Sequence, residues 1–247
     1  TDTPHAVLKN EGTVYVHEAD FGLTLENAGT VLVDGDSLVL TNRLLKVKEG
    51  SVIKNANTGD RLKLIKVDHQ KNVGYMSVGK NAVLAADEIY IDVYNNQGFG
   101  LSGTLEGDKI TVDGSYIDFN ETGEVIGRDV TLTQIDQKNK EQHGGKIIAT
   151  DKLTFTSTVL AEDINITAPV ILAHHNVFRL YGKTTLSGVK HLELGSTMAI
   201  EGDDVKINDN EFVDEVVFLG KTDATYGPRI ENIREKSLGI GKLTVNK

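Results

Sequence analysis

Two adjacent histidines, His174 and His175, are the residues of this chain whose type best suits a metal site. Successive side chains of a strand point to opposite faces, so adjacent histidines do not easily share one ion. The acidic stretches 34–36 and 201–204 could supply calcium ligands, but they lack the ordered glycine–aspartate nonapeptide of calcium-binding β-rolls. The chain has no cysteine, which excludes zinc–thiolate sites. We therefore expect neither a metal nor a cofactor.

Paired carboxylates are the second chemistry to consider, because glycan lyases and hydrolases place two of them about 5–10 Å apart in a groove. Two acidic pairs are adjacent in the chain and point in different directions. They are Asp87 with Glu88, and Asp203 with Asp204. The chain has no tryptophan to stack on sugars, and it has no nucleophile elbow, P-loop or dinucleotide fingerprint. We expect no enzymatic activity, with a β-helical glycan lyase or hydrolase, such as a phage tailspike, as the competing class.

The composition limits the classes of partner. The formal net charge is −10, which argues against nucleic acid and against an anionic membrane surface, since both attract clustered lysine and arginine. No run of 18 apolar residues is present, so we expect no insertion into a membrane. The chain begins at Thr1 without a signal-like segment, and we interpret it as a piece of a longer protein.

The positions that could do chemistry lie within a repeated pattern of glycine, an apolar residue, a small residue, aspartate and two further apolar residues. The turn glycines Gly103, Gly123 and Gly145 follow one another at intervals of 20 and 22 residues, and Gly29 and Gly50 are 21 apart. A period near 20 with short strands is typical of a parallel β-solenoid, because helical repeats are longer and show a 3.6-residue periodicity. The sequence therefore predicts an all-β, right-handed parallel β-helix with irregular loops.

Strand alternation predicts which side chains point inward. The first inward pairs are Val31 with Val33, Val83 with Ala85, Leu105 with Gly107, Val125 with Gly127, and Ile147 with Ala149. The second inward pairs are Leu38 with Leu40, Ile89 with Ile91, Ile110 with Val112, Val130 with Leu132, and Leu153 with Phe155. The repeat that contains Val83 has Asn81 in the place of the turn glycine. The second residue of each first pair is nearly always small, as a narrow corner requires.

Two further sets of residues recur at fixed places in the repeat. An aspartate precedes the second strand and is expected to accept backbone N–H groups at the corner. These aspartates are Asp36, Asp87, Asp108, Asp129, Asp151 and Asp163.

An apolar residue stands between the two inward residues of the first strand, with Glu106 as the exception. These residues, Leu32, Leu84, Ile126, Ile148 and Leu160, would form an outward stripe that either a loop or another protein covers.

Residues 25–40 (LENAGTVLVDGDSLVL) and 119–132 (FNETGEVIGRDVTL) carry the clearest copies of the pattern. They resemble the haemagglutinin repeats of two-partner-secretion exoproteins, the family of filamentous haemagglutinin adhesins and CdiA-type effectors of contact-dependent growth inhibition. Residues 103–112, 145–155 and 158–167 match in part, so the resemblance covers about half of the chain. The secretion domain of the family and its toxin motifs are not visible. The resemblance implies an internal stalk or receptor-binding segment.

The ends are less regular than the middle. We expect one domain over 1–247, with less regular regions at 1–24 and 208–247. Residues 228–239 (PRIENIREKSLG) predict a short helix, because Pro228 suits a first turn and Gly239 suits a C-cap. A helix in this place would block the edge of the sheet.

Interruptions of the repeat are the candidate recognition sites, since loops on a rigid scaffold often bind partners. Residues 66–79, 92–102, 134–145 and 173–182 interrupt the pattern and contain much of the scarce aromatic content. Aromatic rings provide binding anchors, and asparagine amides provide oriented hydrogen bonds. The predicted receptor-binding residues are Tyr75, Met76, Tyr94, Asn95, Asn96 and Phe99. The competing interpretation is that these rings pack inside the solenoid.

The resemblance also supplies expectations about location and partners. It implies a protein secreted to the bacterial cell surface, exported through an outer-membrane transporter. It further implies that the chain binds an outer-membrane protein or a surface glycan of a neighbouring cell. A purely structural stalk segment, which would bind no cell surface, is a further alternative to recognition and to glycan cleavage.

Overall fold

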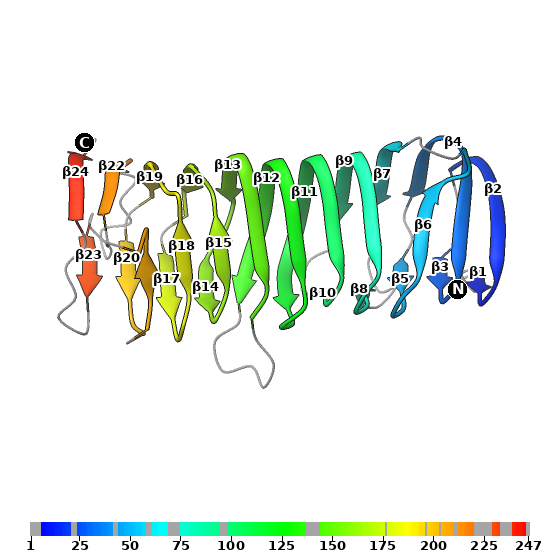
Figure 1. The fold of residues 1–247 in the computed structure, drawn as a ribbon, viewed down its shortest axis with the longest axis horizontal. Helices are drawn as coiled ribbons and strands as arrows, with labels where there is room; N and C mark the ends of the chain where they lie inside the picture. Colours follow the sequence, from blue (N-terminus) through cyan, green and yellow to red (C-terminus); the bar gives the residue numbers. More distant parts are fainter. Residues whose placement is uncertain are drawn as a thin grey trace, which may run out of the picture.

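The computed structural model describes residues 6–20, 24–41, 44–57, 61–68, 75–93, 98–136, 144–175, 177–195, 197–202, 204–209, 212–219, 229–232 and 239–245. Over these residues the chain winds into an elongated parallel β-solenoid, with β1 and β2 at one end and β23 and β24 at the other (Figure 1). All the described strands belong to one continuous sheet. The predicted all-β parallel solenoid is confirmed.

The strands follow one another in chain order without an intervening helix among the described residues. They are β1 (Val7–Asn10), β2 (Thr13–Asp20), β3 (Thr24–Asn27), β4 (Thr30–Thr41), β5 (Leu45–Val47), β6 (Val52–Asn55), β7 (Leu62–Asp68), β8 (Met76–Val78), β9 (Val83–Asp92), β10 (Phe99–Leu101), β11 (Thr104–Phe119), β12 (Glu124–Asp136), β13 (Lys146–Phe155), β14 (Val159–Glu162), β15 (Asn165–Thr167), β16 (Val170–Ala173), β17 (Val177–Tyr181), β18 (Thr185–Ser187), β19 (His191–Leu194), β20 (Thr197–Ile200), β21 (Lys206–Ile207), β22 (Phe212–Phe218), β23 (Arg229–Asn232) and β24 (Gly239–Val245).

Parallel pairing between successive coils builds three faces. Face 1 stacks residues 13–17, 30–33, 52–55, 83–86, 104–107, 124–127, 146–149, 165–167, 185–187 and 206–207. Face 2 stacks residues 19–20, 37–41, 64–68, 88–92, 109–113, 129–132, 152–155, 170–173, 191–194, 215–218 and 242–245. Face 3 stacks residues 7–10, 24–27, 45–47, 76–78, 99–101, 116–119, 134–136, 159–162, 177–181, 197–200 and 229–232.

The inward residues of the three faces form one hydrophobic core along the solenoid. Most of the predicted inward pairs are confirmed, including Val31 with Val33 on face 1 and Leu153 with Phe155 on face 2, all buried. Aromatic rings fill the wider parts of the core, where Phe155 lies against Phe178 with a ring-centroid distance of 5.9 Å. Alternation along each strand therefore identified most of the core correctly.

One predicted inward pair is wrong by a single residue. Val83 is 40% exposed, whereas Leu84 and Ala86 are fully buried. The register pairs Leu84 with Leu105, so Ala82 takes the place of the turn glycine, and the preceding Asn81 adopts a φ of 59°. Because side chains alternate with a period of two, a shift of one residue reverses every side chain in the strand.

The predicted steric requirement for a small residue at the second inward position of face 1 holds in the coils of Gly107 and Gly127. A Cβ atom added to Gly107 would lie 2.6 Å from the backbone oxygen of Ala86 in the preceding coil. A Cβ atom added to Gly127 would lie 2.8 Å from the backbone oxygen of Gly107. Real Cβ atoms essentially never approach another atom as closely as either of these distances, so these two coils accept only glycine here, whereas Val33 and Ala149 occupy the same position in other coils.

The predicted outward apolar stripe is not continuous. Leu84 points inward, and Leu160 lies on face 3, where it pairs with Arg179. On face 1, Leu32 stands beside Lys54, and Glu106 precedes the adjacent pair Ile126 and Ile148. Charged residues therefore divide the stripe into short apolar segments.

Side-chain hydrogen bonds brace the corners between coils. Asn27 is fully buried, and its Nδ2 donates to the backbone oxygens of Gly29 and Val52 at 3.0 and 3.2 Å. Asn10 donates to Asn27 Oδ1 at 2.8 Å. Among the corner aspartates, Asp163 takes the predicted role, since its Oδ1 accepts the backbone N–H of Lys183 at 2.6 Å.

The C-terminal helix predicted over 228–239 is wrong where the structure describes it. Residues Arg229–Asn232 form β23, which pairs with β20 and places Ile230 beside Met198. The open edge of β20 offers backbone hydrogen bonds to an extended segment, and this tertiary pairing outweighs the local helix signals. Residues 228 and 233–238 lie outside the described residues. The described part of the chain contains no helix of a length and hydropathy that would cross a membrane.

The buried asparagine bridge gives a testable expectation for stability. Replacing Asn27 with alanine leaves the Asn10 amide and two backbone oxygens without this partner, so the free energy of unfolding should fall by about 1–3 kcal/mol. The change is measured by urea unfolding followed by circular dichroism. Asn165→Ala is the control, because Asn165 is exposed and should cost less than about 0.5 kcal/mol. Equal losses in the two variants would contradict a structural role for the bridge.

Candidate functional site

The structure separates the predicted receptor-binding residues into three groups. Tyr75 lies on the surface of face 3 and is 42% exposed. Met76 and Phe99 are each 1% exposed and pair with each other in register as inward residues of β8 and β10, so their side chains present no surface to a partner. Both residues therefore belong to the core and not to a receptor-binding surface. The remaining three, Tyr94, Asn95 and Asn96, lie outside the described residues.

Two tyrosine rings cover two glycines on the outer surface of face 3. The register pairs Phe99 with Met76 in the preceding coil and with Ile117 in the next, so Tyr75, Gly98 and Tyr116 occupy equivalent places in three successive coils. A Cβ atom on Gly98 would lie 2.7 Å from Cε2 and Cζ of Tyr116. One on Gly100 would lie 2.5 Å from the Tyr75 hydroxyl oxygen. The Tyr116 and Tyr75 rings therefore lie on the bare backbone of Gly98 and Gly100.

The Tyr75 ring is also fixed at its hydroxyl end. Asp118 pairs with Gly100 in register, so Tyr75 reaches across β10 to a carboxylate in the coil beyond it. Burial raises the pKa of Tyr75 to about 12, with further contributions from the charge of Asp118, from Tyr116 and from a hydrogen bond with Asp118. Tyr75 is consequently protonated at neutral pH and donates this hydrogen bond. We call Tyr75, Ser77, Tyr116, Asp118 and Gln134, with Gly98 and Gly100 beneath the rings, the tyrosine platform.

Tyr116 and Asp118 were missed because they lie within a long regular strand, β11, and not in an interruption of the repeat. The sequence does contain a signal for this site, which is the alternation of Gly98, Phe99 and Gly100. An inward phenylalanine flanked by two outward glycines leaves an uncovered strip of backbone, and rings from neighbouring strands commonly cover such glycines.

A second candidate is a cleft of about 490 Å³ at the corner between faces 3 and 1. Its lining residues are Glu121, Glu124, Gly144, Gly145, Lys146, Asp163, Asn165 and Lys183. Two of its carboxylates have structural partners. Glu124 faces the Lys146 ammonium at 3.8 Å, and Asp163 accepts the backbone N–H of Lys183.

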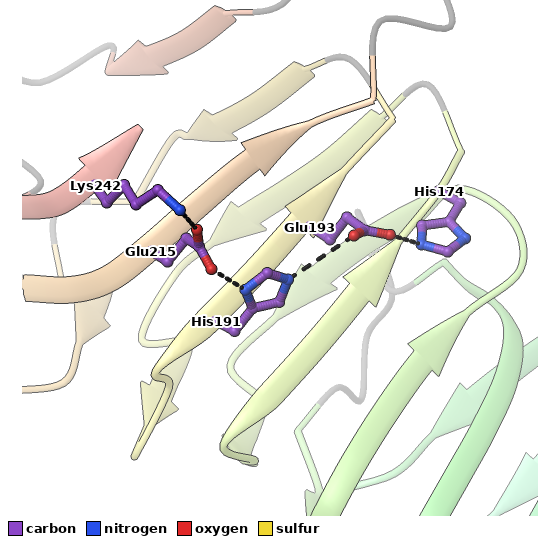
Figure 2. Close-up of polar contacts among 5 residues, drawn as sticks. All are labelled: His174, His191, Glu193, Glu215 and Lys242. Carbon is purple, nitrogen blue, oxygen red and sulfur yellow. Dashed lines mark hydrogen bonds and ion pairs between the residues drawn. The ribbon is translucent and has the colours of Figure 1, made fainter. Parts of the chain in front are cut away.

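A row of side chains, made of one lysine, two glutamates and two histidines, crosses the last coils of face 2 and is linked by hydrogen bonds and ion pairs (Figure 2). Lys242 Nζ lies 2.6 Å from Glu215 Oε1, and Glu215 Oε2 lies 3.0 Å from His191 Nδ1. Glu193 faces His191 at 3.8 Å and His174 at 2.6 Å. Hydrogen bonds, from Lys242 first and then from His191, lower the pKa of Glu215. These contacts connect β24, β22 and β19 with His174, the residue that follows β16. The row therefore links neighbouring coils, which is a structural role.

Three aspartates are stacked in register on face 2, in the coils of β7, β9 and β11. Asp92 pairs with Asp68 in the preceding coil and with Asp113 in the next. Burial raises the pKa of Asp92, and the charges of Asp113 and Asp68 raise it further, while Lys66 opposes them. Lys66 lies 3.2 Å from Asp68 and 5.8 Å from the centre of the Tyr90 ring, so it offsets part of the repulsion.

Over the ranges that the structure describes, no group of three or more histidine, cysteine, aspartate or glutamate side chains is arranged to hold a metal ion. His174 and His175 have separate partners, Glu193 and Thr158. The acidic stretch 34–36 contributes surface contacts, with Asp34 near His17 and Asp36 near Lys63.

The fold and the site define a parallel β-solenoid with an aromatic platform on one face. Comparison with protein-family models, with curated proteins and with solved structures finds no match for this chain.

The contact between the Tyr75 ring and the backbone of Gly100 can be tested directly by substitution. In Gly100→Ala the added methyl group would displace the Tyr75 ring and weaken its contact with Asp118, so the pKa of Tyr75 should fall from about 12 towards its ordinary value. Nuclear magnetic resonance of ¹³C-labelled tyrosine measures this titration. Gly12→Ala is the matched control, since a Cβ atom there meets nothing within 4 Å. An unchanged Tyr75 titration in Gly100→Ala would contradict the described packing.

The stacked aspartates predict that removing the charge of Asp92 stabilises the protein by an amount that depends on pH. A raised pKa means that folding favours protonated Asp92, so its contribution is full in acid and is lost as the pH rises through the raised pKa. Asp92→Asn should therefore stabilise the protein at pH 7 by about 0.2–1 kcal/mol, with the gain vanishing in acid. Thermal unfolding across a pH series measures the effect, and Asp108→Asn, at an exposed corner, is the control. A gain that grows in acid would refute this account.

Proposed function

We propose that this chain is a non-catalytic recognition segment of a large secreted surface protein of the filamentous haemagglutinin and CdiA type. In this proposal it binds an outer-membrane protein or surface glycan of a neighbouring cell. The tyrosine platform is the observation that carries the proposal. It presents rings on a rigid scaffold, and Tyr75, one of the residues chosen from the sequence, is 42% exposed.

The repeat architecture supports the same proposal. Residues 25–40 and 119–132, which carry the resemblance, each contribute one segment to face 1 and one to face 2. A solenoid of stacked coils is an extended spacer that can hold a recognition surface away from the cell that exports it. Secretion to the bacterial surface and export through an outer-membrane transporter are parts of this proposal.

A fixed ring with a partly exposed surface distinguishes Tyr75 and Tyr116 from the aromatic residues of the core. Phe99, Phe155 and Phe178 fill the core, and Tyr181 is only 8% exposed. The Tyr75 ring rests on Gly100 and is held by Asp118, so its exposed area is available without a large loss of side-chain entropy on binding.

The decisive experiment measures binding of the fluorescently labelled chain to bacterial cells. Tyr75→Ala should weaken binding by about 2 kcal/mol or more, which is roughly 30-fold, because it removes an anchor ring. Tyr15→Ala is the matched control, since Tyr15 is 71% exposed on face 1, away from the platform, and its loss should leave binding unchanged. Circular dichroism and thermal unfolding of both variants establish that the fold is retained.

Two outcomes would overturn the proposal. Absence of binding to every cell type tested would favour a structural stalk segment. Release of reducing ends from surface polysaccharides, abolished by one carboxylate substitution in the cleft, would favour a β-helical glycan hydrolase or lyase.

A further inference from the structure

We infer that the tyrosine platform binds an uncharged glycan, with a pyranose ring stacked on Tyr75 and its hydroxyl groups hydrogen-bonded to the polar side chains around it. This inference rests on the proposed recognition function and names the class of ligand that the same site takes.

The orientation of Tyr75 is the first argument. The ring covers the backbone of Gly100, its hydroxyl is hydrogen-bonded to Asp118, and the residue is 42% exposed. A tyrosine held in this way presents a flat apolar surface that is already in position before a ligand arrives. Such surfaces suit the apolar C–H face of a pyranose ring, and little conformational freedom is lost on contact.

The polar groups around the rings are the second argument. Ser77 and Asp118 flank Gly100 in one row across the coils, and Gln134 stands beside Tyr116 in the neighbouring row. All three side chains are partly exposed. A hydroxyl, a carboxylate and an amide together offer both donors and acceptors, which the hydroxyl groups around a sugar ring require.

The spacing of the platform is the third argument. Tyr75 and Tyr116 come from the coils on either side of β10, and their rings lie over Gly100 and Gly98, which are two residues or about 7 Å apart along that strand. An oligosaccharide of a few units that lies along β10 therefore contacts both rings. A stable protein interface needs roughly 800 Å² on each partner, which is far more than two partly exposed rings provide.

Charge decides between classes of glycan. Asp118 lies within the platform, and the chain carries a formal net charge of −10. An acidic polysaccharide would place further carboxylates or sulfates against this charge, whereas an uncharged glycan loses nothing. Binding should accordingly depend little on ionic strength.

The direct test uses saturation-transfer nuclear magnetic resonance on the whole chain. The probes are uncharged hexasaccharides of glucose, galactose and mannose, with hexagalacturonate as the acidic counterpart. We expect transfer to at least one uncharged probe and little to hexagalacturonate. Tyr75→Ala should weaken the affinity at least tenfold, and Tyr15→Ala should leave it unchanged. Tyr75→Phe keeps the stacking face and should retain most of the affinity, which separates stacking from loss of the fold.

A cell-binding arm distinguishes this inference from the proposed function. Periodate treatment of target cells, which cleaves sugar diols, should abolish binding of the chain, whereas protease treatment should not. Cell binding that survives periodate and is lost after protease treatment would overturn the glycan inference and leave the recognition function standing. Binding to an uncharged hexasaccharide without binding to any cell would support the inference while overturning the proposed cellular target. Transfer to none of the uncharged probes, or equal affinity of Tyr75→Ala and the parent, would overturn the inference.

Discussion

Parallel, in-register stacking of one coil on the next is the constraint on which the rest of this structure depends. Each coil bonds its backbone groups to its neighbours, so most residues of the described strands have a fixed counterpart in an adjacent coil. The face 1 corner shows how strict the stacking is, because the backbone oxygen of Ala86 leaves no room for a Cβ atom on Gly107. The buried bridge from Asn10 to Asn27 satisfies polar groups where the chain turns between faces.

The same stacking produces the tyrosine platform. An outward glycine opens a space on a sheet surface, and register decides which neighbouring side chains can enter it. Because Phe99 is aligned with Met76 and Ile117, the rings of Tyr75 and Tyr116 approach Gly98 and Gly100 from the two adjacent coils. With Gln134 on β12, the site is assembled from four coils, and none of them could form it alone.

Stacking also arranges the surface charges in rows, with opposite consequences on different parts of face 2. In one row, Asp68, Asp92 and Asp113 are aligned and repel one another, and burial together with this repulsion raises the pKa of Asp92. In the other, Glu215 lies between Lys242 and His191, and their hydrogen bonds lower its pKa. A repeated fold strengthens both the repulsion in the first row and the attraction in the second, because equivalent side chains lie at the close spacing of adjacent strands.

The sequence by itself determined the architecture and most of the core. A glycine period near 20 and strict alternation are local signals, and they sufficed to predict a parallel solenoid and inward pairs such as Val31 with Val33. Only the tertiary structure decided the register. It placed Leu84 inside, it turned Arg229–Asn232 into a strand on the open edge of β20, and it buried Phe99 while leaving Tyr75 exposed. Register depends on which coil lies beside which, and that information is absent from any single repeat.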